Sequence, residues 1–153
     1  MTRVPVEQFR EVTERYGFNY GPMFFIIKEV WKCDNEGLCL VDISESPAIQ
    51  TEFGRYIVHP SILDACLQSC FVPLGSLLTD DKSIVPVGFE SITLNDVPST
   101  YQLYCHVVAD VMEFGKFDVT LMSPSGKVLL TMSEFRVEEL TNSPRQQIGR
   151  AHV

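Results

Sequence analysis

The sequence predicts an α+β domain in which one buried helix packs against an antiparallel sheet. A short apolar segment that begins at Pro60 has the composition of a helix enclosed by other structure. Further along, between residues 84 and 140, four segments are rich in valine, threonine, phenylalanine and tyrosine and are separated by turn sequences. Such segments are expected to pair as antiparallel strands.

The N-terminal part predicts one helix and one hairpin. Residues 5–16 carry apolar side chains at helical spacing, between Pro5, which suits a first helical turn, and Gly17, which suits a C-terminal stop. The apolar segments 24–33 and 37–43 flank the turn sequence DNEG. This pattern is typical of two paired strands.

The central helix and the later strands complete the predicted domain. Residues 44–56 are polar and predict a loop, and the helix is expected to run from Pro60 to about Phe71, because Pro73 follows. One long helix along a curved antiparallel sheet fits these lengths and is the hotdog fold. The later strands are expected at residues 84–94, 101–111, 117–124 and 127–140.

Composition argues against nucleic-acid and membrane partners. The 153 residues are 45% hydrophobic and 21% charged, as in a globular chain that forms one domain. The net charge of −8 would repel a phosphate backbone. No apolar run approaches the roughly 20 residues of a membrane helix.

Five cysteines without a signal peptide predict reduced thiols in a cytoplasmic protein. Cys66 and Cys70 are spaced to share a metal ion, but further ligands could come only from His59 or His106. No CxxC or HxxxH pattern supports such a site. We therefore expect small packing residues and no metal.

The stretch IVHPSILDACLQSCF places two polar side chains, Asp64 and Gln68, one turn apart in an apolar helix. In one interpretation they form a satisfied structural pair, with Gln68 directed to a loop. In the other, Gln68 orients Asp64 as an acid, because apolar surroundings favour the neutral form of a carboxyl group. We interpret His59 as a helix-start residue and His106 as a residue of the sheet edge or surface.

Three ordered motifs resemble the dehydratase domain of polyketide synthases and animal-type fatty acid synthases. HPSILDACLQ (59–68) matches the family's HPxxLDxxxQ pattern, and NYGPMF (19–24) resembles its YGPxF motif. VPVGFESITL (85–94) resembles a later segment of the same domain. The similarity covers about residues 7–140 and implies the second, C-terminal half of a double hotdog.

This resemblance implies removal of water from a β-hydroxyacyl chain carried on the phosphopantetheine of an acyl carrier protein. Asp64 would donate a proton to the leaving hydroxyl, and Gln68 would hold Asp64. No metal or other directly bound cofactor is implied. The expected partners are a first hotdog that carries a catalytic histidine, the acyl carrier protein and a second copy of a homodimeric synthase. The implied substrate-binding positions are Tyr20, Gly21, Pro22, His59, Pro60, Leu63 and Pro86.

The family's base, a histidine in an HxxxGxxxxP motif, has no counterpart among the three histidines, the third of which is His152. We therefore expect the chain to be inactive alone and to be a fragment of a multidomain synthase. In this interpretation residues 1–16 form an N-terminal helix or linker and residues 17–140 form the hotdog. Residues 141–153, which end in IGRAHV and show no periodicity, are expected to be a disordered, artefactual tail.

Two alternatives to dehydration stay open. One is a relative with different chemistry, such as a product-template cyclase, and the other is a non-catalytic single hotdog that binds acyl chains. Gln68, where some family members have histidine, favours a polyketide synthase over a fatty acid synthase. The motifs do not identify the acyl substrate.

Overall fold

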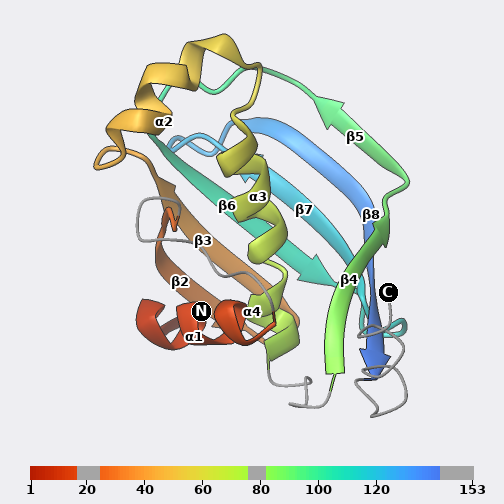
Figure 1. The fold of residues 1–153 in the computed structure, drawn as a ribbon. Coiled ribbons are helices and arrows are strands. Elements are labelled where there is room, and N and C mark those ends of the chain that lie inside the picture. Colours follow the sequence, from red (N-terminus) through yellow and green to blue (C-terminus); the bar gives the residue numbers. More distant parts are fainter. Residues whose placement is uncertain (17–24, 76–81, 142–153) are drawn as a thin grey trace, which may run out of the picture.

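The computed structural model describes residues 1–16, 25–75 and 82–141, and within them one curved antiparallel sheet surrounds helix α3 (Pro60–Gln68) (Figure 1). Eight strands form this sheet in the order β1-β2-β3-β6-β7-β8-β4, and β5 also pairs with β8. The strands are β1 (Thr2–Val4), β2 (Ile27–Cys33), β3 (Glu36–Asp42), β4 (Lys82–Gly88), β5 (Ser91–Leu94), β6 (Gln102–Ala109), β7 (Lys116–Met122) and β8 (Val128–Thr141).

The helices other than α3 lie near the two ends of the sheet (Figure 1). They are α1 (Val6–Arg15), α2 (Pro47–Glu52), the short 3-10 helix η1 (Phe53–Arg55) and α4 (Phe71–Leu74). Helix α1 confirms the predicted N-terminal helix, and its Phe9 and Thr13 are buried. Strand β1, which is too short for a periodic signal, pairs with β2 in the same sheet. The first 16 residues thus contribute to the sheet and the core.

Two predictions around the central helix were wrong. The segment 44–56 is not a loop but forms α2 and η1, because Ile49 is buried in the core and Pro47 suits a first helical turn. Helix α3 ends at Gln68 rather than Phe71, and a second short helix, α4, begins at Phe71. In one continuous α-helix, the ring of Pro73 would clash with the carbonyl group of Ser69, four residues earlier.

The predicted strand at residues 84–94 is divided into β4 and β5, which pair with different parts of β8. Pro86 has no N–H for the ladder, and the pairing register shifts between Pro86 and Gly88. On β8, Glu134 has φ 51° and donates its N–H to Asp118 Oδ1 at 3.1 Å. This irregularity in β8 lies between the two pairing regions.

The core lies between α3 and the concave face of the sheet. Strand β3 alternates strictly, so that Cys39 and Val41 point inward and are fully buried. Ala65 and Cys66 of α3 are equally buried, which confirms the prediction of an enclosed helix. All five cysteines are free thiols, and all but Cys33 are buried. Burial raises the pKa of the Cys39 and Cys70 thiols.

In the described part of the chain, no single helix is long and apolar enough to cross a membrane. Only as a bent pair would Pro47–Arg55 and Pro60–Leu74 reach the necessary length and composition.

Candidate active site

His59 holds the start of helix α3. Its ring is 5% exposed, its Nδ1 accepts the Ser61 N–H at 3.0 Å, and its Nε2 lies 2.9 Å from Glu52 Oε2. Because Nδ1 is an acceptor, the hydrogen of the neutral ring is on Nε2 and is donated to Glu52. The ring also packs edge-on against Tyr56, with centroids 5.2 Å apart. The predicted role of a helix-start residue is confirmed.

Asp64 and Gln68 lie one turn apart on α3 and contact each other, as their spacing predicts. Gln68 Nε2 donates a hydrogen bond of 3.3 Å to Asp64 Oδ2. The Asp64 side chain is half-buried, whereas Gln68 is only 2% exposed. Since a buried amide has few alternative partners, this contact restricts the orientation of the carboxyl group.

The pair is not fully satisfied. The side-chain carbonyl oxygen of Gln68, Oε1, is buried and has no hydrogen-bond partner among the described residues. Leaving such a group unpaired costs about 1–3 kcal/mol of stability. The interpretation of Asp64 and Gln68 as a structural pair and their interpretation as an oriented acid both stay predictions. In native proteins such a group is explained by strain, by a catalytic role or by a bound water or ion.

A cavity of about 160 Å³, which we name the Asp64 cavity, opens beside Asp64 between the helices and the β4–β8 edge of the sheet. Of the described residues that line it, Asp64 is the one with a charged side chain. The others are Leu67, Cys70, Phe71, Leu74, Ile84, Pro86, Phe135 and Val137.

The predicted site residues are distributed unevenly around this cavity. Asp64 and Pro86 line it, and Gln68, which is not part of the lining, contacts Asp64. His59, Pro60 and Leu63 are not part of the lining either. Tyr20, Gly21 and Pro22 lie outside the described residues. Substrate contact by these six residues stays a prediction.

Sequence reasoning missed most of the cavity wall. Leu67, Phe71 and Leu74 follow Asp64 at helical spacing, so the face of α3 and α4 that carries Asp64 could have been read from the sequence. Phe135 and Val137 reach the cavity from β8, far away in the sequence. No local pattern predicts that contact.

The arrangement combines one carboxyl group with an apolar cavity. Apolar walls bind an apolar ligand chain by removing its surface from water, and a single polar group then fixes its orientation. A carboxyl group in this position can exchange a proton with an oxygen atom of the ligand. Within the described residues, no group of three or more histidine, cysteine or acidic side chains is placed to hold a metal ion.

The curved sheet around α3 defines a hotdog domain, and Asp64 gives its apolar cavity an acidic group. Comparison with known families assigns the chain to a family with this fold. Residues 1–147 match the family described as "Polyketide synthase dehydratase N-terminal domain". The chain belongs to the polyketide synthase dehydratase family.

Solved structures support this membership and confirm the predicted hotdog fold. The dehydratase domain from the CurK module of curacin polyketide synthase is 26% identical, with a TM-score of 0.78 over 92% of this chain and 48% of that chain. The dehydratase domain of RzxB from Pseudomonas fluorescens, at 18% identity and a TM-score of 0.76, shares the fold. The chain thus spans about half the length of these solved domains.

Curated relatives are large synthases. Phthioceranic/hydroxyphthioceranic acid synthase of Mycobacterium bovis is 26% identical over 138 residues, which are 88% of this chain and 6% of that protein. The highly reducing polyketide synthase lcsB of Purpureocillium lilacinum is 24% identical over 143 residues, 92% of this chain and 6% of that protein. These matches confirm the prediction of a polyketide synthase dehydratase domain. The family description names an N-terminal domain, so the assignment to the second hotdog stays a prediction.

Proposed function

We propose that this chain is the aspartate-bearing half of a polyketide synthase dehydratase domain and that Asp64 is its catalytic acid. The observation that carries the proposal is the position of the Asp64 carboxyl group, which lies on an apolar cavity and is held by a buried amide. The HPxxLDxxxQ motif supports assignment to the second hotdog, because it contains both side chains.

The proposed reaction removes water from a β-hydroxyacyl thioester. A base takes the α-proton, and the electron pair of that C–H bond forms the double bond to the β-carbon. The C–O bond breaks at the same carbon, and its oxygen leaves as water with the proton donated by Asp64. Hydroxide is a poor leaving group, so the acid and the base each contribute roughly 10²–10⁴ in rate.

Gln68 is proposed as a positioning residue. Its Nε2 contacts the oxygen Oδ2 of Asp64, which leaves the other carboxyl oxygen for the proton that is donated. The unpaired Gln68 Oε1 is consistent with a site that is completed by a group from outside the described residues.

The base is proposed to come from the other half of the domain. His59 is a poor candidate because both of its ring nitrogens have partners and it does not line the Asp64 cavity. His106 lies on β6, 3.4 Å from Glu36, and is equally absent from that lining. Two structures of the CurK dehydratase are described as inactive mutants, one with a histidine changed to phenylalanine and one with an aspartate changed to asparagine. They support a shared histidine and aspartate chemistry.

The remaining partners follow from this assignment. The acyl chain would arrive on the phosphopantetheine arm of an acyl carrier protein, so that no metal or nicotinamide takes part in this step. The histidine-bearing hotdog and the other domains of a homodimeric synthase complete the assembly. The chain alone is proposed to be inactive, because it supplies the acid without the base.

The test compares Asp64→Asn with the wild type in the complete dehydratase domain that contains this chain. We expect the rate of enoyl thioester formation, followed by its absorbance, to fall roughly 10²–10⁴-fold. Asp34→Asn is the matched control, because Asp34 is exposed in the β2–β3 turn at φ 49°, which asparagine tolerates. A rate for Asp64→Asn close to that of the control, in a folded protein, would overturn the proposal.

A further inference from the structure

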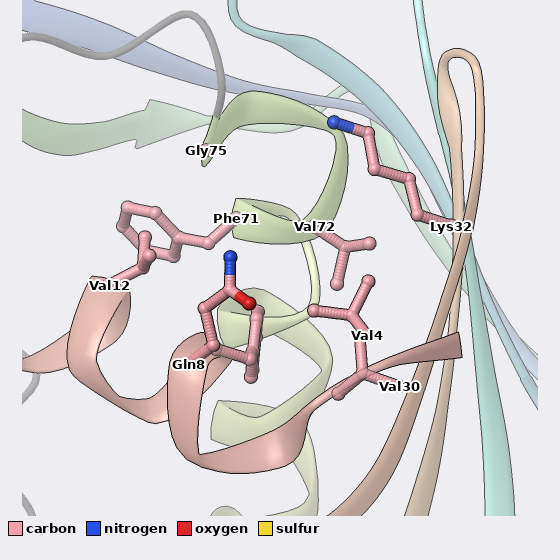
Figure 2. A pocket seen from close by; sticks show the side chains of 9 residues that line it. Val4, Gln8, Val12, Val30, Lys32, Phe71, Val72 and Gly75 are labelled. Atoms are coloured by element: carbon pink, nitrogen blue, oxygen red, sulfur yellow. The ribbon is translucent and has the colours of Figure 1, made fainter. Parts of the chain in front are cut away.

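A second cavity lies between helices α1 and α4 and strands β1 and β2 (Figure 2). Its volume is about 240 Å³, and we name it the α1 cavity because α1 contributes Gln8, Phe9 and Val12 to its lining. Valine side chains from β1, β2 and α4 form much of the remaining wall. The lining also includes the charged side chain of Lys32 on β2, so the α1 cavity is larger than the Asp64 cavity and mainly, but not entirely, apolar.

Phe71 belongs to the lining of both cavities. It is 4% exposed, and its ring stacks on Tyr16 with centroids 5.9 Å apart and an interplanar angle of 19°. Its neighbours on α4 differ in this respect, since Leu74 lines only the Asp64 cavity and Val72 only the α1 cavity. Phe71 is thus a lining residue that the two cavities share.

Close packing against the sheet fixes the position of this residue. Val72 lies against Gly37 of β3 so closely that a Cβ atom at Gly37 would be 2.7 Å from Val72 Cβ. Helix α4 therefore cannot move toward the sheet, and the stack on Tyr16 restrains Phe71 from the side of α1.

We propose that Phe71 limits the length of the acyl chain that this site accepts, and that the α1 cavity is a second acyl compartment closed by its ring. The inference rests on the proposed function, since it deepens the description of the same site. A cavity of roughly 150 Å³ holds a benzene molecule, so the Asp64 cavity has room for about six carbon atoms. A longer chain meets Phe71.

Binding measurements on the complete dehydratase domain that contains this chain test this limit. The probes are saturated acyl thioesters of N-acetylcysteamine with 4 to 14 carbons, titrated by calorimetry. Each further buried methylene tightens binding about fourfold, so affinity should rise with length and level off near about six carbons in the wild type. In Phe71→Ala the rise should continue to about twelve carbons, because the ring no longer separates the cavities.

Three further variants distinguish loss of the Phe71 ring from simple enlargement of the Asp64 cavity. Leu74→Ala removes three carbon atoms from the wall of the Asp64 cavity but keeps the Phe71 ring, so its length limit should rise by no more than about three carbons, less than in Phe71→Ala. Val12→Phe in the Phe71→Ala background refills the α1 cavity from α1 and should restore the wild-type limit. Phe71→Leu, a milder change that keeps an apolar side chain in the core, should give an intermediate limit if Phe71→Ala does not fold.

The outcomes are distinguishable. A length limit that stays unchanged in folded Phe71→Ala and Phe71→Leu, or that moves as far in Leu74→Ala, overturns the role of Phe71 and leaves the proposed dehydration intact. Failure of the wild type to bind any thioester overturns the acyl site and this inference together.

Discussion

At the start of α3 both ring nitrogens of His59 have partners, whereas at the end of the same helix Gln68 keeps a buried carbonyl oxygen without one among the described residues. The two side chains are almost equally buried and belong to one ten-residue motif. His59 bonds to the backbone of its own helix, and Gln68 holds a carboxyl group at a cavity.

From this difference we expect His59 to be a structural residue and Gln68 to serve the proposed site. A satisfied buried group stabilises the fold, while an unsatisfied one costs stability and persists where function requires it. Removal of His59 should therefore reduce stability, and removal of the Gln68 amide should reduce activity.

The largest expected effect on stability comes from His59→Ala. It removes the helix cap, the contact with Glu52 and a buried ring, and should lower the free energy of unfolding by about 2–3 kcal/mol. Denaturant unfolding of the chain measures this change. His59→Asn, which restores a capping oxygen, should recover about 1 kcal/mol of the loss. Equal losses for the two variants would show that the ring's packing, and not its cap, holds the helix start.

Gln68→Leu should have a smaller effect on stability, with the opposite sign. Leucine fills a similar volume without an unpaired oxygen, so the free energy of unfolding should stay the same or rise by about 1 kcal/mol. Dehydration by the complete domain should fall about tenfold, because Asp64 loses its positioning contact. A marked loss of stability in Gln68→Leu would show that the amide is structural after all.

The Cys70 thiol, which lines the Asp64 cavity, should react slowly with alkylating reagents, without any change in stability or activity being required. Burial raises the pKa of Cys70, and contact with Cys66 together with burial raises that of Cys105, so both remain protonated as the pH is increased to 8. Exposed Cys33 should therefore react with iodoacetamide more than about tenfold faster than either, since each unit of raised pKa lowers the thiolate fraction tenfold. Mass spectrometry of the labelled peptides gives the rates. If Cys70 reacts as fast as Cys33, the cavity is open to water rather than apolar and closed.

Local sequence signals predicted the elements that depend on nearby residues. The spacing of apolar side chains identified α1, and proline positions located the start of α3. The hairpin β2–β3 followed from two apolar segments around a turn sequence. In each case the signal and the structure that it predicts lie within about 20 residues.

The errors occurred where distant contacts decide the outcome. The segment 44–56 contains helices because Ile49 reaches the core, and its polar composition does not show this. The division between β4 and β5 depends on how each pairs with β8, whose partner residues lie 36 to 59 positions further along the chain. Strand β1 exists because β2 offers it an edge.

The sequence by itself determined the meeting of Asp64 and Gln68, because residues four apart on a helix are neighbours in any fold that contains that helix. It also determined the family, through the motif around them. Only the tertiary structure decided what the carboxyl group faces. Ile84, Pro86 and Phe135 reach the cavity through strand pairing, and Phe71 becomes a shared lining residue only because α1 packs beside α4. Such contacts depend on strand register and on the packing of segments that are distant in the sequence, and the local spacing of apolar residues does not encode either.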